Sequence, residues 1–267
     1  MIQDAFIVPH SPILIPAIGK ANIALLQKTA QSYAKLAEKI ISLEPELIVI
    51  ISPHSQSDTE NFTINISPKM MINFEEFGDF ATKNEANGDI ALAHELKEAL
   101  RSDYEIKLTT QERLDYGSAI PYHLLTENYK KVKVLPLAPS TLDIANHYEF
   151  GKKLGDFLIN RPEKILIIAS ADLSHRLKRR SIYGYSPKGA KFDNKLIEYL
   201  SNPENAAENI LKMDANLVKE AMSCGLKSII LSLGIISRLE YQPQVLSYQG
   251  DLGIGYLALD FNIDYAD

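Results

Sequence analysis

Three short runs of apolar, largely β-branched residues constrain the fold of this 267-residue chain more than any other feature. Leu47–Ile51 contains no polar residue, and Ala5–Val8 and Ile165–Ile168 have the same character. A strand that is apolar on both faces is typical of the interior of a parallel sheet, where helices cover both sides. The runs therefore predict strands buried inside a layered fold.

Segments with helical periodicity alternate with the strands. The longest extends from about Ala21 to Leu43, where Leu25, Leu36 and Ile40 mark an apolar stripe. Other helices are expected near residues 90–100, 143–159, 190–200, 215–224 and 226–239, and other strands at 62–66, 133–137, 244–247 and 256–261. No linker or composition break divides the chain. We predict one α/β domain, residues 1–267, with a central mixed, largely parallel sheet and helices on both faces.

Composition and charge narrow the classes of function. The formal net charge of -6 argues against a nucleic-acid or anionic-membrane partner. No apolar run approaches the roughly 20 residues of a membrane helix, and Met1 to Pro12 is too soon interrupted to form a signal peptide. The single cysteine, Cys224, cannot form an intrachain disulfide, which fits a reducing compartment. We therefore expect a soluble cytoplasmic protein, and the sequence allows a homo-oligomer.

Three of the buried runs end in turns that are rich in Ser, His and Asp. His10 follows the first run, His54 follows the second, and His175 closes the turn after the third. In open α/β sheets, polar residues just beyond the carboxyl ends of the strands are the default site candidates. One such histidine is more often a hydrogen-bonded structural residue. Three histidines in the same position change that balance. A shared functional site is then about as well supported as three separate structural roles.

Five motifs occur in order along the chain: Val8-Pro9-His10-Ser11-Pro12, Ile51-Ser52-Pro53-His54, Ala169-Ser170-Ala171-Asp172-Leu173-Ser174-His175, Cys224-Gly225-Leu226-Lys227-Ser228 and Leu246-Ser247-Tyr248-Gln249-Gly250. Together they resemble the catalytic (LigB-type) subunit family of class III extradiol ring-cleavage dioxygenases, over essentially the whole chain. The segment from Tyr183 to Gly189, followed by Phe192-Asp193, resembles the branch that accompanies AMMECR1-domain and radical-SAM proteins. That branch is related to the Memo proteins.

The resemblance implies a metal, a substrate class and several residue roles. In the family, two histidines and an acid hold Fe(II), and the matching histidines here are His10 and His54. The implied substrate is a small catechol-type aromatic. His175 falls on a further histidine that moves protons, a role that suits a group whose pKa lies near neutrality. Asp172, in the same turn, is expected to orient His175.

The third metal ligand is left open between Glu220 and Cys224, which are four residues apart on an expected helix and hence on one face. Glu220 would complete a set of two histidines and one carboxylate. Cys224 matches a cysteine that lies with the histidine pair in Memo proteins, and a thiolate favours softer metals such as copper or zinc. Glu220 could equally be a solvated helix charge, and Cys224 a small buried residue. Close relatives carry an acid directly before this cysteine, where this chain has Ser223.

Two further positions depart from the family pattern. Tyr116 stands where related sequences have a histidine that helps to activate substrate or oxygen, and tyrosine is a poor acid-base group near neutrality. Gln249 stands where relatives usually have an acid. His123 could partly substitute for the missing imidazole, although a structural role is favoured, and His147 is expected to be solvated near a helix start.

These observations support two functions from different classes. The first is a non-heme iron-dependent dioxygenase that cleaves the ring of a catechol, or a diverged activity at that site. The second is a Memo-like metal-binding protein that cleaves no ring and works with an AMMECR1-type or radical-SAM partner. A hydrolase that uses Ser174 and His175 is disfavoured, because no Gly-x-Ser-x-Gly elbow is present.

Overall fold

Four parallel strands form the middle of the sheet in a computed structural model that describes residues 1–55, 60–181 and 183–264. Their order is β7 (Lys133–Ala138), β2 (Leu47–Ile51), β8 (Ile165–Ser170) and β1 (Ile2–Val8). Every residue of β2 and β8 is buried. Because successive side chains of a strand point to opposite faces, Val49 packs into one apolar core and Ile50 into the other.

The remaining strands make the sheet mixed. On one side of the parallel centre, β10 (Tyr256–Asp260) pairs antiparallel with β1, and β9 (Gln244–Gln249) pairs antiparallel with β10. On the other side, β5 (Asp79–Gly88) lies parallel to β7, and β4 (Lys69–Phe74) is antiparallel to β5. A branch consists of β3 (Phe62–Asn65), antiparallel to β7, and β6 (Ile106–Thr109), parallel to β3.

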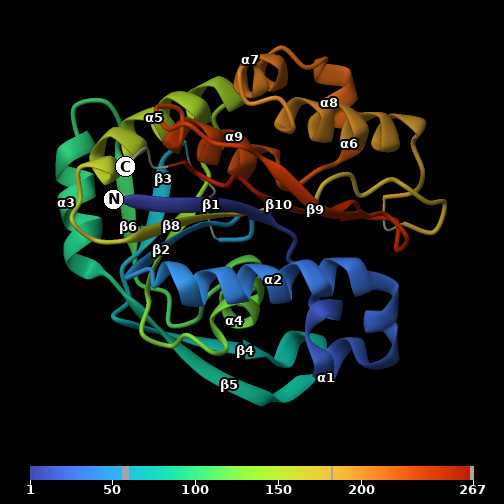
Figure 1. The fold of residues 1–267 in the computed structure, drawn as a ribbon, viewed down its shortest axis with the longest axis horizontal. Helices are drawn as coiled ribbons and strands as arrows, with labels where there is room; N and C mark the ends of the chain where they lie inside the picture. The colour runs from blue at the N-terminus through green and yellow to red at the C-terminus, as the bar shows by residue number, and fades with distance from the viewer. Residues whose placement is uncertain (56–59, 182, 265–267) are drawn as a thin grey trace.

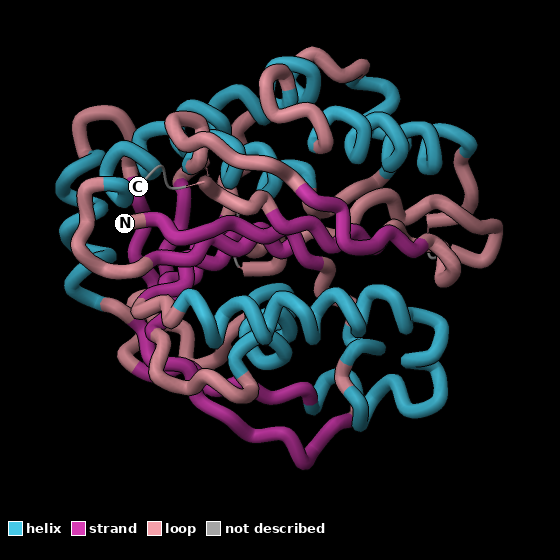
Figure 2. The backbone as a smooth tube through the Cα atoms, viewed as in Figure 1, coloured by secondary structure: helices cyan, strands magenta, loops and turns pink. Residues whose placement is uncertain are grey.

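Helices cover both faces of the sheet, as Figures 1 and 2 show. One face carries α2 (Gln27–Leu43) and α4 (Tyr116–Thr126), together with the short α1 (Pro16–Gly19). The other face packs against six helices: α3 (Ile90–Leu100), α5 (Ile144–Ile159), α6 (Pro187–Leu200), α7 (Ala206–Leu211), α8 (Ala215–Ala221) and α9 (Leu226–Ile235). The predicted single α/β domain with a mixed, mostly parallel sheet between helical layers is confirmed.

Several local expectations differ from the structure. The long N-terminal helix begins at Gln27, because a 3₁₀ segment, Lys20–Leu26, precedes it and leaves Leu25 exposed. His147 is fully buried rather than solvated: its Nε2 accepts the Ser140 N–H at 3.1 Å, and burial lowers its pKa to about 4. Over the described ranges, the helices are all too short or too polar to cross a membrane.

Candidate metal centre

The order of the central strands brings two of the predicted histidines together. Because β8 lies between β2 and β1 and all three are parallel, their carboxyl ends meet at one edge of the sheet. His10 follows β1 and His54 follows β2 at this edge. Cys224 comes from elsewhere, in the loop between α8 and α9. One ligand atom from each of His10, His54 and Cys224, which we call the donor group, lies within 4.8 Å of the other two.

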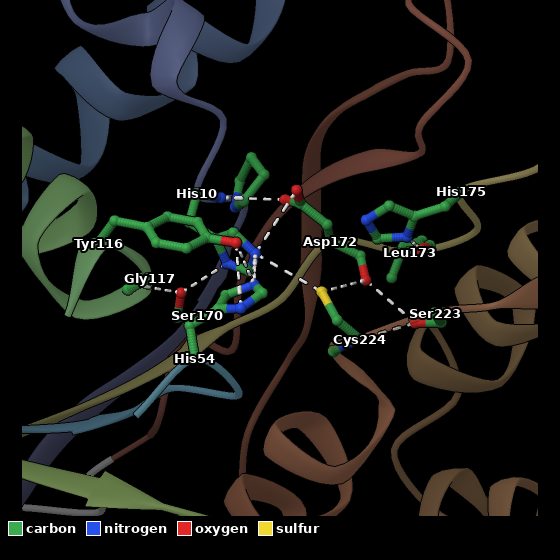
Figure 3. A network of polar contacts seen from close by, with 12 residues as sticks. His10, His54, Tyr116, Gly117, Ser170, Asp172, Leu173, His175, Ser223 and Cys224 are labelled. Atoms are coloured by element: carbon green, nitrogen blue, oxygen red, sulfur yellow. Dashed lines mark hydrogen bonds and ion pairs between the residues drawn. The ribbon is translucent and has the colours of Figure 1, made fainter. Parts of the chain in front are cut away.

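The donor atoms of this group face one another in Figure 3. His10 Nε2 is 3.0 Å from His54 Nε2 and 3.5 Å from Cys224 Sγ. The His10 side chain is 2% exposed, whereas His54 and Cys224 are partly exposed. The group therefore has one deeply buried member and two members nearer to solvent.

A serine at the end of β8 selects the tautomer of His10. Ser170 Oγ donates a hydrogen bond to the carbonyl oxygen of Gly117 and lies 2.8 Å from His10 Nδ1. Since the hydroxyl proton is already used, Ser170 must accept the proton of His10 Nδ1. The lone pair of His10 then resides on Nε2, which faces the donor group. A hydrogen bond of this kind on the far ring nitrogen is the usual support of a metal-binding histidine.

The turn that carries His54 is tied to the start of α4. The backbone N–H of His54 donates to Ser52 Oγ at 3.2 Å, and that hydroxyl donates to Asp115, the N-cap of α4. Gly117 permits this packing, because a Cβ there would stand 2.5 Å from Ser52 Oγ and 3.1 Å from His54 Cδ2. A side chain at Gly117 would displace the turn.

Tyr116 covers His54. The two rings are stacked with centroids 4.3 Å apart, and the Tyr116 hydroxyl lies 2.9 Å from His54 Nε2. Burial raises the pKa of Tyr116 further above its ordinary value. The phenol therefore reaches the centre as a neutral hydrogen-bond donor and cannot serve as a base near neutrality.

Burial also keeps the two imidazoles neutral. It lowers the pKa of His10 to about 3 and that of His54 to about 4, in the second case with help from the neighbouring His10. Neutral imidazole is the form that binds metal ions. The thiol of Cys224 has a raised pKa, first because it is buried and second because Asp172 is near.

Asp172 contacts His10 rather than His175. Its Oδ1 accepts the backbone N–H of His10 at 3.0 Å, and its Oδ2 lies 3.5 Å from His10 Nε2. The ring of His175 lies on the other side of Asp172 in Figure 3, with Nδ1 3.1 Å from the carbonyl oxygen of Leu173. The orientation of His175 thus comes from the backbone of its own turn, and Asp172 instead borders the donor group.

Glu220 and Cys224 do not share a helix face, contrary to the sequence-based expectation. Helix α8 ends at Ala221 because Met222 adopts a left-handed conformation, with φ of 53°. Glu220 remains on the helix, where its carboxylate lies 2.8 Å from Arg176 Nη1. Of the two ligand candidates, the structure brings only Cys224 into the donor group.

The other residues singled out from the sequence have contacts away from the donor group. Gln249 accepts the backbone N–H of Thr29 at 2.8 Å and so ties β9 to α2. His123 packs its ring against Phe74 and lies 3.2 Å from the Asn84 amide nitrogen. Ser223 donates to the carbonyl oxygen of Asp172 at 3.0 Å, which fixes the loop just before Cys224.

Sequence reasoning gave no role to Ser170, Asp115 or Gly117, although all three shape the centre. The sequence does offer a clue to Ser170. It is the one residue with a hydroxyl group in β8, and it stands at the end of the strand that meets the site. The role of Asp115 and Gly117 depends on the approach of α4 to β2, which the local sequence does not encode.

A cavity of about 350 Å³ opens beside this centre. His54, Asp115 and Tyr116 form its wall beside the donor group, and the rest is formed by residues of β3, β4, β6 and β7, by the segment 111–114, and by Ser55 and Glu76. We call this space the side cavity.

Comparison with known proteins assigns the chain to a family. The model of the catalytic LigB subunit of aromatic ring-opening dioxygenases matches residues 4–258. The chain belongs to that family. The resemblance drawn from the sequence motifs is thereby confirmed, whereas the finer resemblance to the branch that accompanies AMMECR1-domain proteins stays a prediction.

Individual relatives are distant. The chain is 27% identical to Protein CA_C1420 of Clostridium acetobutylicum, with 96% of this chain and 56% of that protein covered. It is 27% identical to a 2,3-dihydroxyphenylpropionate/2,3-dihydroxicinnamic acid 1,2-dioxygenase of Klebsiella pneumoniae, with 62% and 54% covered. The 4,5-DOPA dioxygenase extradiol of Beta vulgaris is 28% identical, with 75% and 74% covered. The chain thus spans about half the length of the first two relatives.

A solved structure supports the fold alone. The crystal structure of an uncharacterized protein from Escherichia coli superposes with a TM-score of 0.69 at 18% identity. The match covers 97% of this chain and 100% of that one.

Proposed function

We propose that the protein is a non-heme metal-dependent dioxygenase that opens the ring of a catechol-type aromatic, with His10, His54 and Cys224 as metal ligands. The observation that carries the proposal is the convergence of these three donors within 4.8 Å beside a cavity large enough for a substituted ring. Membership of the ring-opening dioxygenase family supports the same reaction class.

The residues fit a divalent transition metal. Two imidazoles kept neutral by burial and one thiol suit iron, copper or zinc, in contrast to the oxygen ligands that magnesium and calcium prefer. Fe(II) is the ion that the family resemblance favours. When bound, such a metal would supply the positions at which a catechol diol and dioxygen meet.

The protein's own groups would orient the substrate and move its protons. The Tyr116 hydroxyl, 2.9 Å from His54 Nε2, is placed to donate a hydrogen bond to a substrate oxygen. His175 would accept a proton at Nε2, because its Nδ1 proton is directed to the carbonyl oxygen of Leu173. With a phenol in place of a second imidazole, proton transfer is expected to limit the rate.

A second candidate function is favoured by the identity of the third donor. A cysteine, and not Glu220, stands beside the histidine pair, which is the arrangement that the sequence resemblance associates with Memo proteins. On this interpretation the protein binds a metal, cleaves no ring and acts with an AMMECR1-type or radical-SAM protein.

Elemental analysis of anaerobically purified protein, combined with oxygen uptake on a panel of catechols, separates the two. The dioxygenase proposal expects one metal per chain and oxygen consumption that yields the yellow ring-opened product. A metal without oxygen consumption supports the second candidate. The control is the double variant His10→Ala/His54→Ala, which should contain no stoichiometric metal; unchanged metal content in it would refute both proposals.

A further inference from the structure

The walls of the side cavity are polar where a buried strand would normally be apolar. Along β3, Phe62 and Ile64 pack into the apolar core, whereas Thr63 and Asn65 line the cavity. Thr109 of β6, the register partner of Asn65, lines it too. The residues by which this strand pair lines the cavity, Thr63, Asn65 and Thr109, are therefore all neutral and hydrogen-bonding.

Thr63 is the innermost of these residues. It is 5% exposed, and within the described residues its hydroxyl has no hydrogen-bond partner. Its strand neighbours are Ala138, which offers only a methyl group, and Lys107, which is exposed and does not line the cavity. A hydroxyl that is buried without a partner loses its hydrogen bonds to water and forms none within the protein, which lowers the stability of the folded state. Valine has nearly the same shape and would avoid that loss. Because Thr63 also lines the cavity, its hydroxyl is available to a group that enters there.

Apart from Asp115, the charged residues of the cavity stand at its exposed end; the Asp115 carboxylate lies beside His54 and already accepts hydrogen bonds from Ser52 and Ser55. Arg113 and Glu76 line the rim and are both exposed. The Arg113 guanidinium already lies 3.5 Å from the Glu75 carboxylate. Thr63, Pro136 and Ala138 are buried and uncharged, and we call this part of the lining the interior. A ligand group that reaches the interior would meet a hydroxyl and no opposite charge.

We infer that the side cavity receives a neutral hydrogen-bonding substituent of the aromatic substrate, an amide or a hydroxyl, and that the Thr63 hydroxyl is its partner. The inference rests on the proposed function in one respect, since it takes the aromatic diol to lie at His10, His54 and Cys224. The volume of about 350 Å³ suits one ring with a short side chain.

Three catechols of nearly equal size test the inference: 4-butylcatechol, 3-(3,4-dihydroxyphenyl)propanamide and 3-(3,4-dihydroxyphenyl)propanoate. Binding to the purified protein is measured by equilibrium dialysis without oxygen, so that no ring cleavage occurs. The amide is expected to bind most tightly. Thr63→Val should weaken its binding by about tenfold, the value of one good hydrogen bond, and should leave 4-butylcatechol unchanged.

Ser228→Ala is the matched control. Ser228 on α9 also has a buried hydroxyl without a partner within the described residues, but it does not line the side cavity. Its replacement should leave all three affinities unchanged. Thermal unfolding shows whether both variants fold, which is expected because neither substitution removes a hydrogen bond to another described residue.

Several outcomes would overturn the inference. They are equal affinities for the three compounds, no binding of any, or an amide affinity that Thr63→Val leaves intact. Tightest binding of the propanoate, lost in Arg113→Gln, would show that the cavity recognises an anion instead. Oxygen uptake is a separate measurement: amide preference without ring cleavage would support the cavity assignment and refute the dioxygenase proposal.

Discussion

Replacing Ser170 by alanine tests whether the tautomer of His10 prepares the centre for a metal. The serine hydroxyl is the acceptor for the His10 Nδ1 proton, because its own proton goes to Gly117. Both Ser170 and His10 are buried, so water cannot replace the lost acceptor. The ring would then favour the other tautomer, whose Nε2 carries the proton and cannot bind a metal.

The expected loss can be estimated from the role of this contact. Removing the partner of a metal-binding histidine typically weakens metal affinity by about 10- to 100-fold, which corresponds to about 1.4–2.8 kcal/mol. The assay is competition for Co(II) or Zn(II) between the protein and a chromophoric chelator at fixed pH. Loss of the hydrogen bond at the buried His10 Nδ1 should also lower the free energy of unfolding by about 1–3 kcal/mol.

Ser232→Ala provides the control. Ser232 is also fully buried, and its hydroxyl donates to the carbonyl oxygen of Ile229 at 2.7 Å within α9. Its replacement removes a hydrogen bond of similar kind outside the centre and should leave metal affinity unchanged. Equal affinities for wild type and a folded Ser170→Ala protein would refute the tautomer argument.

Cys224→Ser is expected to reduce stoichiometric metal in elemental analysis, whereas Glu220→Gln leaves it unchanged, because only the cysteine lies in the donor group; the reverse order would place the carboxylate at the metal. Tyr116→His should raise oxygen consumption with a simple catechol at constant metal occupancy, because a missing acid-base group typically costs about 10²–10⁴-fold; fast wild-type turnover without a gain would contradict this. Burial raises the pKa of Asp193 from 3.8 to about 6, so the native state binds its proton more tightly than the unfolded chain. Asp193 alone should therefore lower the free energy of unfolding by about 3 kcal/mol as the pH rises from 4 to 6. Asp193→Asn should flatten that part of the profile in urea unfolding, and an unchanged slope would assign the fall to other groups.

The centre of the fold could be predicted from the sequence, but its edge could not. β2 and β8 are apolar on both faces, and only the interior of a covered sheet accommodates such strands. β4 and β5 were missed. In β5, residues such as Phe80 and Lys83 are exposed and no apolar face marks the strand, whereas β4 is short and buries only Met70, Ile72 and Phe74. Their position in the sheet is set by the pairing of β5 with β7, which lies further along the chain.

Part of the candidate site could likewise be predicted from the sequence. His10 and His54 follow buried parallel strands, so their meeting at one sheet edge follows from topology. The choice between Glu220 and Cys224 depended on where one helix stops. That stop is made by Met222 in a left-handed conformation, which a non-glycine residue adopts only through its tertiary context. The local sequence also does not determine where the side chains of the turn from Asp172 to His175 point.

The position of β1 has a consequence for the order of events during folding. Its two neighbours in the sheet are β8, which begins at Ile165, and β10, which begins at Tyr256. Contacts of such long sequence separation form slowly, because a large loop must close before they contribute. β1 precedes both of its partners in the chain and is thus among the last strands to be enclosed. His10 and Cys224, 214 residues apart, can meet only after that step. We therefore expect metal loading to follow assembly of the sheet, and not to guide it as it does in zinc fingers.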